Sequence, residues 1–375
     1  MPPDPQTFQP GRRLLFVSGA LQGHLNPMLP LALAAQAEGC SVVFATGPEW
    51  SGWLRGHGLE AWSVGSSHEA AGGNRQASWL AYFARTAHAR IDELLALAQA
   101  WRPDIVVHEE TELAGPVVAA RVGARAVVHG LGIMPPQRLW PHFAEAVNAL
   151  GAAQGVTHAA QALQDAPYLQ LCPPSMRTTT EAPVWRHAWP LRPLGVPLRP
   201  DERLPATIDR LPHLRTIYLT LGTVFNDRTE LLQEVIAGLQ ALPLNLVVTV
   251  GGDGDPARLG TQPSHVLIER YVPNALLLPR CDLVVSHGGS GTLFGTLGQG
   301  LPTLLLPQGA DQFGNAAAAQ AAGAALVLES GATTAAAVAA AARRLLDEPG
   351  FARAARRLQA EIGALPGPAK VLARL

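Results

Sequence analysis

A glycine-rich segment whose residue types suit an anion directly follows one apolar run of the sequence. Its residues are His287, Gly288, Gly289, Ser290, Gly291 and Thr292. Because glycine has no Cβ, the backbone N–H groups can approach an anion closely, and a following helix N-terminus would add unpaired donors and about half a positive charge. The serine, threonine and histidine side chains can donate further hydrogen bonds. The segment is therefore predicted to hold a phosphate group, with a tight turn that binds no ligand as the alternative.

Two other chemistries of glycine-rich turns are disfavoured by spacing. A nucleotide-binding P-loop needs Gly-Lys-Ser/Thr, but the segment has no lysine, and Lys370 is the only lysine of the chain. A serine hydrolase needs Gly-x-Ser-x-Gly, whereas the fifth residue counted from Gly288 is Thr292.

Short apolar runs alternate along the chain with longer helical patterns. The strands and helices that they predict must position the glycine-rich segment. Apolar runs in the first half predict strands at residues 14–17, 42–45, 105–107 and 126–128, with helices at 28–38 and 113–121. The pattern restarts with predicted strands at 216–219, 246–250, 266–268, 283–285 and 303–306, and helices at 228–240, 292–299, 312–322 and 335–346. Continuously apolar strands separated by helices indicate an α/β fold with parallel, doubly wound sheets.

A proline-rich stretch separates the two halves and predicts an extended linker without a regular ladder or helix. Its prolines are Pro173, Pro174, Pro183, Pro190, Pro193, Pro197, Pro200 and Pro205. We therefore expect two Rossmann-like domains, residues 1–200 and 201–375, that face each other across a ligand-binding cleft. The helical tail from about residue 350 is expected to pack back on the first domain.

Composition narrows the class of protein. At 375 residues, 48% of them hydrophobic, the chain is long enough for two cores. The net charge of -1 gives no support for nucleic-acid binding. Three scattered cysteines lack metal-ligand spacing and favour a reducing compartment, and no run approaches the roughly 18 apolar residues of a membrane helix. We expect a cytoplasmic protein without a membrane span.

Further motifs surround the glycine-rich segment: Arg270-Tyr271-Val272-Pro273-Asn274, Gly300-Leu301-Pro302, Pro307 and Ala310-Asp311-Gln312. Together with the segment they resemble the donor-binding signature of the UDP-glycosyltransferase superfamily (fold GT-B), close to bacterial antibiotic and macrolide glycosyltransferases. Two further matches are Gly23-His24-Leu25-Asn26-Pro27 and Leu219-Thr220-Leu221-Gly222-Thr223, so the resemblance covers nearly the whole chain.

The resemblance implies a role for each part of the donor site. Tyr271 would lie against the nucleotide base, whose edge the backbone of Val272 would read; whether that base is uracil or thymine is open. An aromatic face stacks on any base with about 1–3 kcal/mol. Thr220, Gly222 and Thr223 would lie near the phosphates. Asp311 and Gln312 would bind the sugar hydroxyls, with helix capping by Asp311 as an alternative or additional role.

At the N-terminal end, the resemblance makes His24 the general base that takes a proton from the acceptor hydroxyl. A carboxylate would orient the ring and stabilise the imidazolium. Glu109 is the expected partner, Glu112 is the alternative, and Glu110 lies between them; a solvated acidic loop is the structural interpretation of all three.

The acceptor is expected on the N-terminal side, where aromatic residues suit a flat or greasy small molecule, although core packing explains several of them equally well. The candidate walls are Trp79, Tyr82, Phe83, Met134, Trp140 and Phe143. The helix terminus already supplies positive potential, so neither a metal nor another cofactor is expected, and Asp253-Gly254-Asp255 is interpreted as a turn. The expected partners are a nucleotide sugar and a small-molecule acceptor, and a homodimer is compatible with the family.

The sequence thus predicts an inverting, metal-independent transfer of a sugar from a UDP- or dTDP-sugar to a natural-product aglycone. Two alternatives are kept: a nucleotide-sugar 2-epimerase of similar form, which needs no acceptor base, and a nucleotide-sugar-binding scaffold without chemistry.

Overall fold

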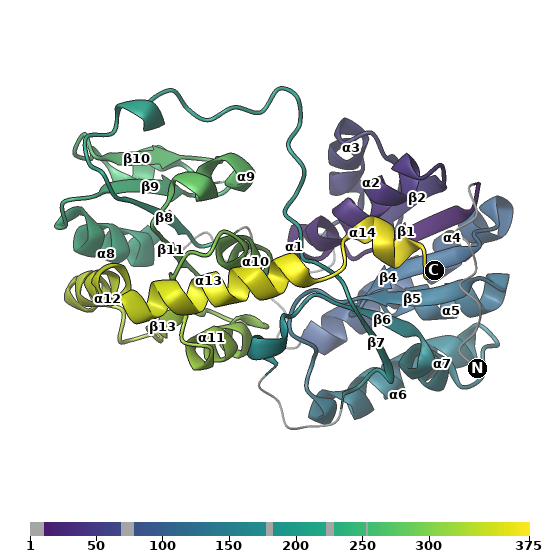
Figure 1. Ribbon diagram of the computed structural model, residues 1–375. Helices are drawn as coiled ribbons and strands as arrows, with labels where there is room; N and C mark the ends of the chain where they lie inside the picture. The colour runs from purple at the N-terminus through teal and green to yellow at the C-terminus, as the bar shows by residue number, and fades with distance from the viewer. Residues whose placement is uncertain (1–10, 69–78, 178–182, 223–228, 253) are drawn as a thin grey trace. The chain divides into compact units, whose positions relative to one another are not determined.

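The computed structural model describes residues 11–68, 79–177, 183–222, 229–252 and 254–375. The chain forms two compact units (Figure 1). The first unit comprises Met1–Cys172, Thr179–Arg192 and Leu365–Leu375, and the second comprises Pro173–Thr178 and Pro193–Ala364. A single domain boundary at residue 200, and a cleft between the domains, stay predictions.

The first unit is built on a seven-stranded sheet in the order β3-β2-β1-β4-β5-β6-β7, with every neighbouring pair parallel. Its strands are β1 (Arg13–Val17), β2 (Ser41–Thr46), β3 (Glu60–Ser63), β4 (Ile105–Glu109), β5 (Arg125–His129), β6 (Pro167–Gln170) and β7 (His187–Pro190). Its helices are α1 (Gln22–Leu25), α2 (Leu29–Ala37), α3 (Pro48–Gly56), α4 (Trp79–Trp101), α5 (Ala114–Val122), α6 (Trp140–Ala153), α7 (Ala159–Asp165) and α14 (Pro368–Leu372). Strand β4 is buried along its whole length, as a parallel strand covered by helices must be.

The second unit is built on a six-stranded parallel sheet in the order β10-β9-β8-β11-β12-β13. Its strands are β8 (Thr216–Thr220), β9 (Asn245–Thr249), β10 (Val266–Glu269), β11 (Leu283–Ser286), β12 (Thr303–Leu305) and β13 (Ala325–Val327). Its helices are α8 (Thr229–Gln240), α9 (Asn274–Leu277), α10 (Ser290–Gly298), α11 (Gln312–Ala321), α12 (Ala335–Asp347) and α13 (Pro349–Ala364). The predicted α/β class with two parallel, doubly wound sheets is confirmed.

Each sheet has one point at which the order of strands reverses. In the first unit this point lies between β1 and β4, and in the second between β8 and β11. Connections leave the two strands of such a pair toward opposite faces, so the carboxyl ends of the strands leave a crevice in which ligands bind. The predicted residues follow these strands: His24 comes after β1 and Glu109 ends β4, while Thr220 ends β8 and His287 comes after β11.

The prediction that the proline-rich stretch forms no ladder was wrong at one place. Residues His187–Pro190 form β7, which pairs parallel with β6. Pro190 is tolerated because β7 is the edge strand, where a missing N–H costs no central ladder bond. The helix predicted over residues 28–38 is also shorter, because the 3-10 turn Asn26–Met28 precedes α2.

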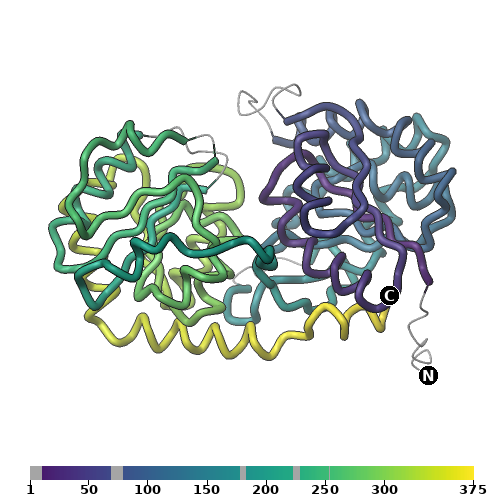
Figure 2. Tube along the Cα trace, turned by 90° about the horizontal axis from the view of Figure 1, so that it is seen from above, coloured from purple at the N-terminus to yellow at the C-terminus, as the bar shows by residue number. Residues whose placement is uncertain are grey.

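The C-terminal segment belongs to the first unit. Helix α14 packs on α2, and Figures 1 and 2 both show this yellow segment beside the purple N-terminal elements. Arg192 holds the approach to the helix by donating from its backbone N–H to the carbonyl of Pro366 at 2.8 Å. The guanidinium of Arg374 lies 4.1 Å from the centre of the Trp189 ring in β7.

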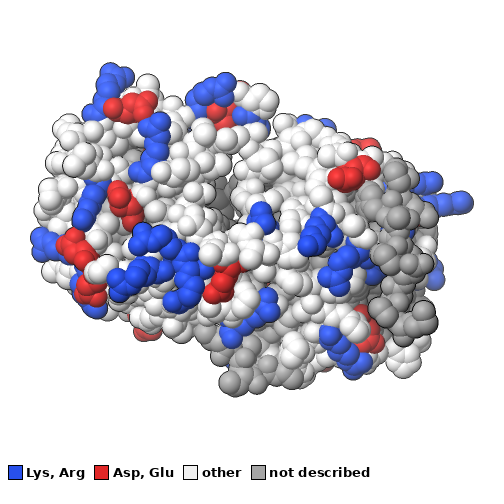
Figure 3. Space-filling model, in the orientation of Figure 1, with Lys and Arg blue, Asp and Glu red and all other residues white. Residues whose placement is uncertain are grey.

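The visible surface is sparsely charged, as a chain with 15% charged residues predicts, and basic and acidic side chains are interspersed on it (Figure 3). No helix within the described ranges is both long and apolar enough to cross a membrane.

Candidate active site

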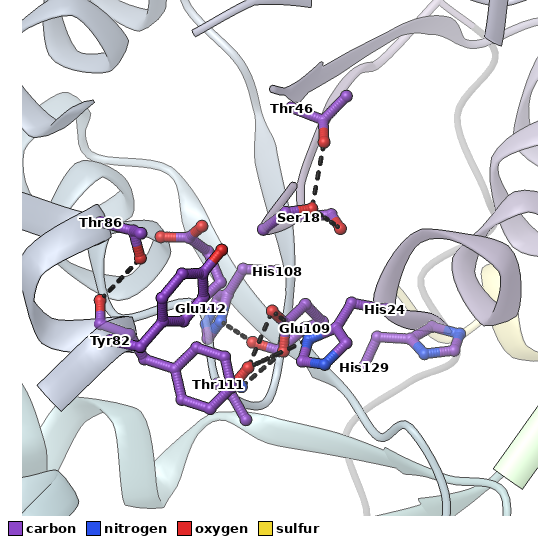
Figure 4. Close-up of polar contacts among 12 residues, drawn as sticks. Ser18, His24, Thr46, Tyr82, Thr86, His108, Glu109, Thr111, Glu112 and His129 are labelled. Atoms are coloured by element: carbon purple, nitrogen blue, oxygen red, sulfur yellow. Dashed lines mark hydrogen bonds and ion pairs between the residues drawn. The ribbon is translucent and has the colours of Figure 1, made fainter. Parts of the chain in front are cut away.

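The reversal point of the first sheet carries a histidine–carboxylate pair (Figure 4). His24 lies in the short helix α1 rather than in an open turn, and its Nδ1 is 3.0 Å from Oε1 of Glu109. The side chain of His24 is 18% exposed and that of Glu109 only 1%, so the carboxylate sits beneath the ring and the ring keeps a solvent-facing edge.

The environment keeps Glu109 ionised although it is buried. Burial raises the pKa of this carboxyl, but His24 and hydrogen bonds from Thr111 outweigh it, so the pKa lies below its ordinary value. An ionised carboxylate can only accept, so Nδ1 of His24 is assigned as the donor of this contact from the hydrogen-bond network. Nε2 of His24, which lies on the other side of the ring, is then the atom that can take up a proton.

The two other acidic residues of the loop have different partners. Tyr168 donates its hydroxyl to Oε2 of Glu110 at 2.6 Å. Arg90 donates to Oε2 of Glu112 at 2.7 Å, and both of these side chains are almost fully buried. Of the three candidates, the structure thus brings Glu109 to His24.

The expected acceptor residues fall into two groups. Trp79, Tyr82 and Phe83 form a ring cluster at the start of α4, and the Phe83 ring lies 5.6 Å from that of His24. Tyr82 is only 2% exposed and its hydroxyl is 2.7 Å from Nδ1 of His68, so its ring is part of the core. Met134, Trp140 and Phe143 pack against the core of the first unit, and no ring contact joins them to His24 among the described residues.

The glycine-rich segment bridges β11 and α10 in the second unit. Helix α10 begins at Ser290, and its N-cap, Gly289, makes no side-chain cap hydrogen bond. Because the N-cap is a glycine, no side chain at that position competes with an anion for the first N–H groups of the helix.

The ring of His287 lies where two glycines make room for it. A Cβ at Gly222, whose φ is +79°, would approach a ring carbon of His287 to 2.5 Å, and one at Gly289 would approach Nε2 to 2.4 Å. Burial lowers the pKa of His287 to about 4, although Asp311 and a hydrogen bond to the backbone of Thr220 oppose this. The Nδ1 atom is buried without a hydrogen-bond partner in the described structure.

A polar network joins the phosphate segment to the predicted sugar site. Ser290 donates its hydroxyl to Oδ2 of Asp311 at 2.8 Å. Asn315, fully buried in α11, donates to the same carboxylate at 2.9 Å and to the carbonyl of Gly288 at 2.9 Å. Asp311 is the N-cap of α11 but makes no cap hydrogen bond with its side chain, so the capping alternative is wrong. Gln312 accepts from the backbone of Gln308 at 2.7 Å, which leaves its amide nitrogen to face another group.

The remaining donor-site candidates are placed as follows. Tyr271 is 59% exposed and donates its hydroxyl to Oε1 of Glu202 at 3.1 Å. The side chain of Val272 is buried, so only its backbone can read a base. Thr220 is nearly buried, and its hydroxyl oxygen accepts from the N–H of Gly222 at 3.3 Å. Thr223 lies outside the described residues.

Of the Asp-Gly-Asp stretch, the structure describes Gly254 and Asp255. Asp253 lies outside the described residues, and Asp255 caps a 3-10 turn by accepting from the N–H of Ala257 at 3.1 Å. Over the part of the chain that the structure describes, no cluster of three metal-ligating side chains is present.

Sequence reasoning missed Thr111, Arg90 and Asn315. For Arg90 a signal existed, because it lies between the buried positions Ala87 and Ile91 of α4, and a charge inside an apolar stripe predicts a buried partner. For Asn315 and Thr111 the sequence offered only their nearness to Asp311 and Glu109.

Two family models match the two halves of the chain separately. Residues 73–187 match the family model described as "Erythromycin biosynthesis protein CIII-like, N-terminal domain", and residues 233–375 match its C-terminal domain. The chain is 32% identical to the L-demethylnoviosyl transferase of Streptomyces niveus, over 81% of this chain and 82% of that one. It is 31% identical to the elloramycin glycosyltransferase ElmGT of Streptomyces olivaceus, over 97% and 96%.

A solved structure shows the same architecture. The glycosyltransferase VinC in complex with dTDP matches with a TM-score of 0.81 and 28% identity, over 96% of this chain and 97% of that one.

Proposed function

The chain belongs to the erythromycin-biosynthesis-protein-CIII-like family of GT-B glycosyltransferases, and on this premise we propose an inverting, metal-independent enzyme. It moves a sugar from a dTDP-sugar to a hydroxyl of a natural-product aglycone. The observation that carries the proposal is the 3.0 Å contact between Nδ1 of His24 and the buried, ionised Glu109. An epimerase has no need of an acceptor base held in this way.

The donor is proposed to bind the second unit. Its diphosphate lies at the N-terminus of α10 and against His287, whose Nδ1, buried without a partner among the described residues, can donate to a phosphate oxygen once the ring is protonated. Tyr271 stacks on the base and Asp311 accepts from sugar hydroxyls. The thymidine diphosphate held by VinC supports a dTDP-sugar over a UDP-sugar.

In the reaction, Nε2 of His24 takes the proton of the acceptor hydroxyl while the oxygen attacks the anomeric carbon. The bond from that carbon to the diphosphate breaks, and the nucleoside diphosphate leaves with the electron pair. Glu109 holds the ring in the required tautomer and stabilises the imidazolium. The N-terminus of α10 stabilises the charge that develops on the leaving group, so no metal ion is required.

Transfer is tested by incubating the protein with UDP- and dTDP-sugars and a panel of hydroxylated polycyclic aglycones, with product masses as the readout. We expect a glycosylated acceptor, with dTDP as the preferred nucleotide and unchanged yield in EDTA. Isomerised donor without acceptor would favour the epimerase, and binding without any reaction would favour the scaffold. Loss of activity in EDTA would contradict metal independence.

The base is tested by His24→Ala. Turnover should fall by about 10²–10⁴-fold, the usual contribution of a positioned base. The affinity for dTDP, measured by calorimetry, should stay unchanged because the donor residues lie in the second unit. Unchanged turnover would remove His24 from the mechanism.

A further inference from the structure

Thr111 contacts both members of the histidine–carboxylate pair. Its hydroxyl oxygen is 2.9 Å from Oε1 and 2.8 Å from Oε2 of Glu109, and 3.2 Å from Nδ1 of His24. Its backbone N–H donates to Oε2 of Glu109 at 2.6 Å. Figure 4 shows its side chain beside the carboxylate that faces the His24 ring.

These contacts form a closed arrangement. The hydroxyl proton of Thr111 is directed at the carboxylate, because an ionised Glu109 can only accept. The oxygen of that hydroxyl keeps lone pairs for the Nδ1–H of His24, whose proton is then shared between Thr111 and Glu109. The backbone N–H fixes one carboxylate oxygen, so the other is left pointing at the ring.

No other described group takes the place of the hydroxyl. The buried rings of His108 and His129 lie on β4 and β5 near Glu109, but their Nδ1 atoms contact the backbone carbonyls of Glu109 and Gly130. Arg90 of α4 is engaged by Glu112. The remaining charged or titratable neighbours are Glu110, which accepts from Tyr168, and the buried Tyr82. Among the described residues, His24 and Thr111 alone donate to the Glu109 carboxylate.

We propose that Thr111 is a positioning residue of the proposed reaction: its hydroxyl fixes the orientation of Glu109 and shares its negative charge, and so sets the basicity of His24. The inference rests on the proposed function of the pair. A carboxylate that loses a charge-assisted donor holds the imidazolium proton more tightly. Removing the hydroxyl also removes the 3.2 Å acceptor of the Nδ1–H, but the donor to the charged carboxylate is closer, at 2.8–2.9 Å, and charge-assisted, so the net effect should be a more basic His24.

The test compares Thr111→Val, which keeps the shape and the backbone N–H, with Thr111→Ser, which restores the hydroxyl. In ligand-free protein with isotope-labelled histidine, the titration of His24 is followed by NMR and assigned with His24→Gln. Thr111→Val should shift the His24 titration to higher pH, while Thr111→Ser should titrate like the wild type. Thr86→Val is the matched control, because the Thr86 hydroxyl bonds only the carbonyl of Phe83 in its own helix, at 3.0 Å.

An unshifted or downward-shifted titration in Thr111→Val would overturn the inference, as would equal shifts in Thr111→Val and Thr111→Ser. The titration needs no substrate, so its outcome is separate from the success of the transfer panel. With a donor and acceptor that the panel identifies, turnover at neutral pH should also fall roughly tenfold in Thr111→Val and recover in Thr111→Ser.

Discussion

Burial keeps the His287 ring neutral, whereas a hydrogen bond from its Nδ1 to a phosphate needs a second proton on the ring. Burial lowers its pKa to about 4, so the ring is neutral in the free protein at neutral pH. A neutral ring has one N–H, and the hydrogen bond to the Thr220 backbone uses it. The buried Nδ1 therefore lacks the proton that a phosphate oxygen would accept.

Donor binding is consequently expected to protonate His287, because the diphosphate charge raises the pKa of the ring that faces it. Calorimetry of dTDP binding at neutral pH, in buffers of different ionisation enthalpy, should show uptake of up to about one proton per site. His287→Gln should bind more weakly and take up less. Equal proton uptake by the two proteins would contradict this role.

Much of the residue-level site could be predicted from sequence, because motifs place residue types at fixed offsets from strand ends. His24, Glu109 and His287 lie at the expected strand ends. The resemblance already implied Glu109 as the partner of His24, but the supporting contacts of Thr111 and Asn315 could not be predicted, since Asn315 meets the carbonyl of Gly288 across 27 positions. Such meetings depend on how helices pack on the sheet.

At the level of elements, Arg90 ties α4 to the carboxyl edge of the first sheet. It donates to the carbonyl of Ser18, after β1, at 2.8 Å and to that of Ala45, in β2, at 3.3 Å, besides its ion pair with Glu112. One guanidinium therefore joins the ends of two strands and the loop that follows β4.

Replacing Arg90 by methionine should lower the free energy of unfolding by about 3–5 kcal/mol, because Glu112 is left as a buried charge without its partner. Adding Glu112→Gln to that variant should recover part of the loss. Arg121→Met, at an exposed position of α5, is the control and should change little. Urea unfolding monitored by hydrogen exchange of β1 and β4 checks this, and a loss below about 1 kcal/mol in Arg90→Met would contradict it.

The continuously apolar strands could be predicted, whereas the peripheral strands and the helices α3, α4, α6 and α7 of the first unit were not. Strands β3, β6, β7 and β13 lack the continuous, fully buried apolar run that marks the equally short strands β11 and β12. They form as strands because they pair with the adjacent strand of the sheet, which their own sequences do not reveal. Pro190 argued against a strand at this place in the sequence, and it is tolerated in β7 only because β7 is an edge strand.

At the scale of the whole molecule, the last residues of the sequence stabilise the unit that contains its first ones. Val371 and Leu372 are 1% exposed, and their helix α14 packs on α2. The sequence analysis predicted that the C-terminal tail packs on the first domain. It could not predict the surface that the tail contacts, because an amphipathic helix does not specify its partner.

Leu372→Ala should lower the stability of the first unit by about 2–5 kcal/mol, as expected for truncating a buried leucine. Leu358→Ala in α13, whose side chain is fully buried, should instead affect the second unit. Hydrogen exchange of β1–β5 against β8–β12 separates the two effects. Faster exchange confined to the second unit in Leu372→Ala would contradict the assignment.

The proposed single displacement fixes the stereochemistry of the product. A base at His24 activates the acceptor on one side of the anomeric carbon while the diphosphate leaves from the other. The most direct test is the anomeric configuration, by NMR, of the glycoside formed from dTDP-α-D-glucose and an aglycone accepted in the panel. Inversion predicts a β-glucoside, and an α-glucoside would contradict the account.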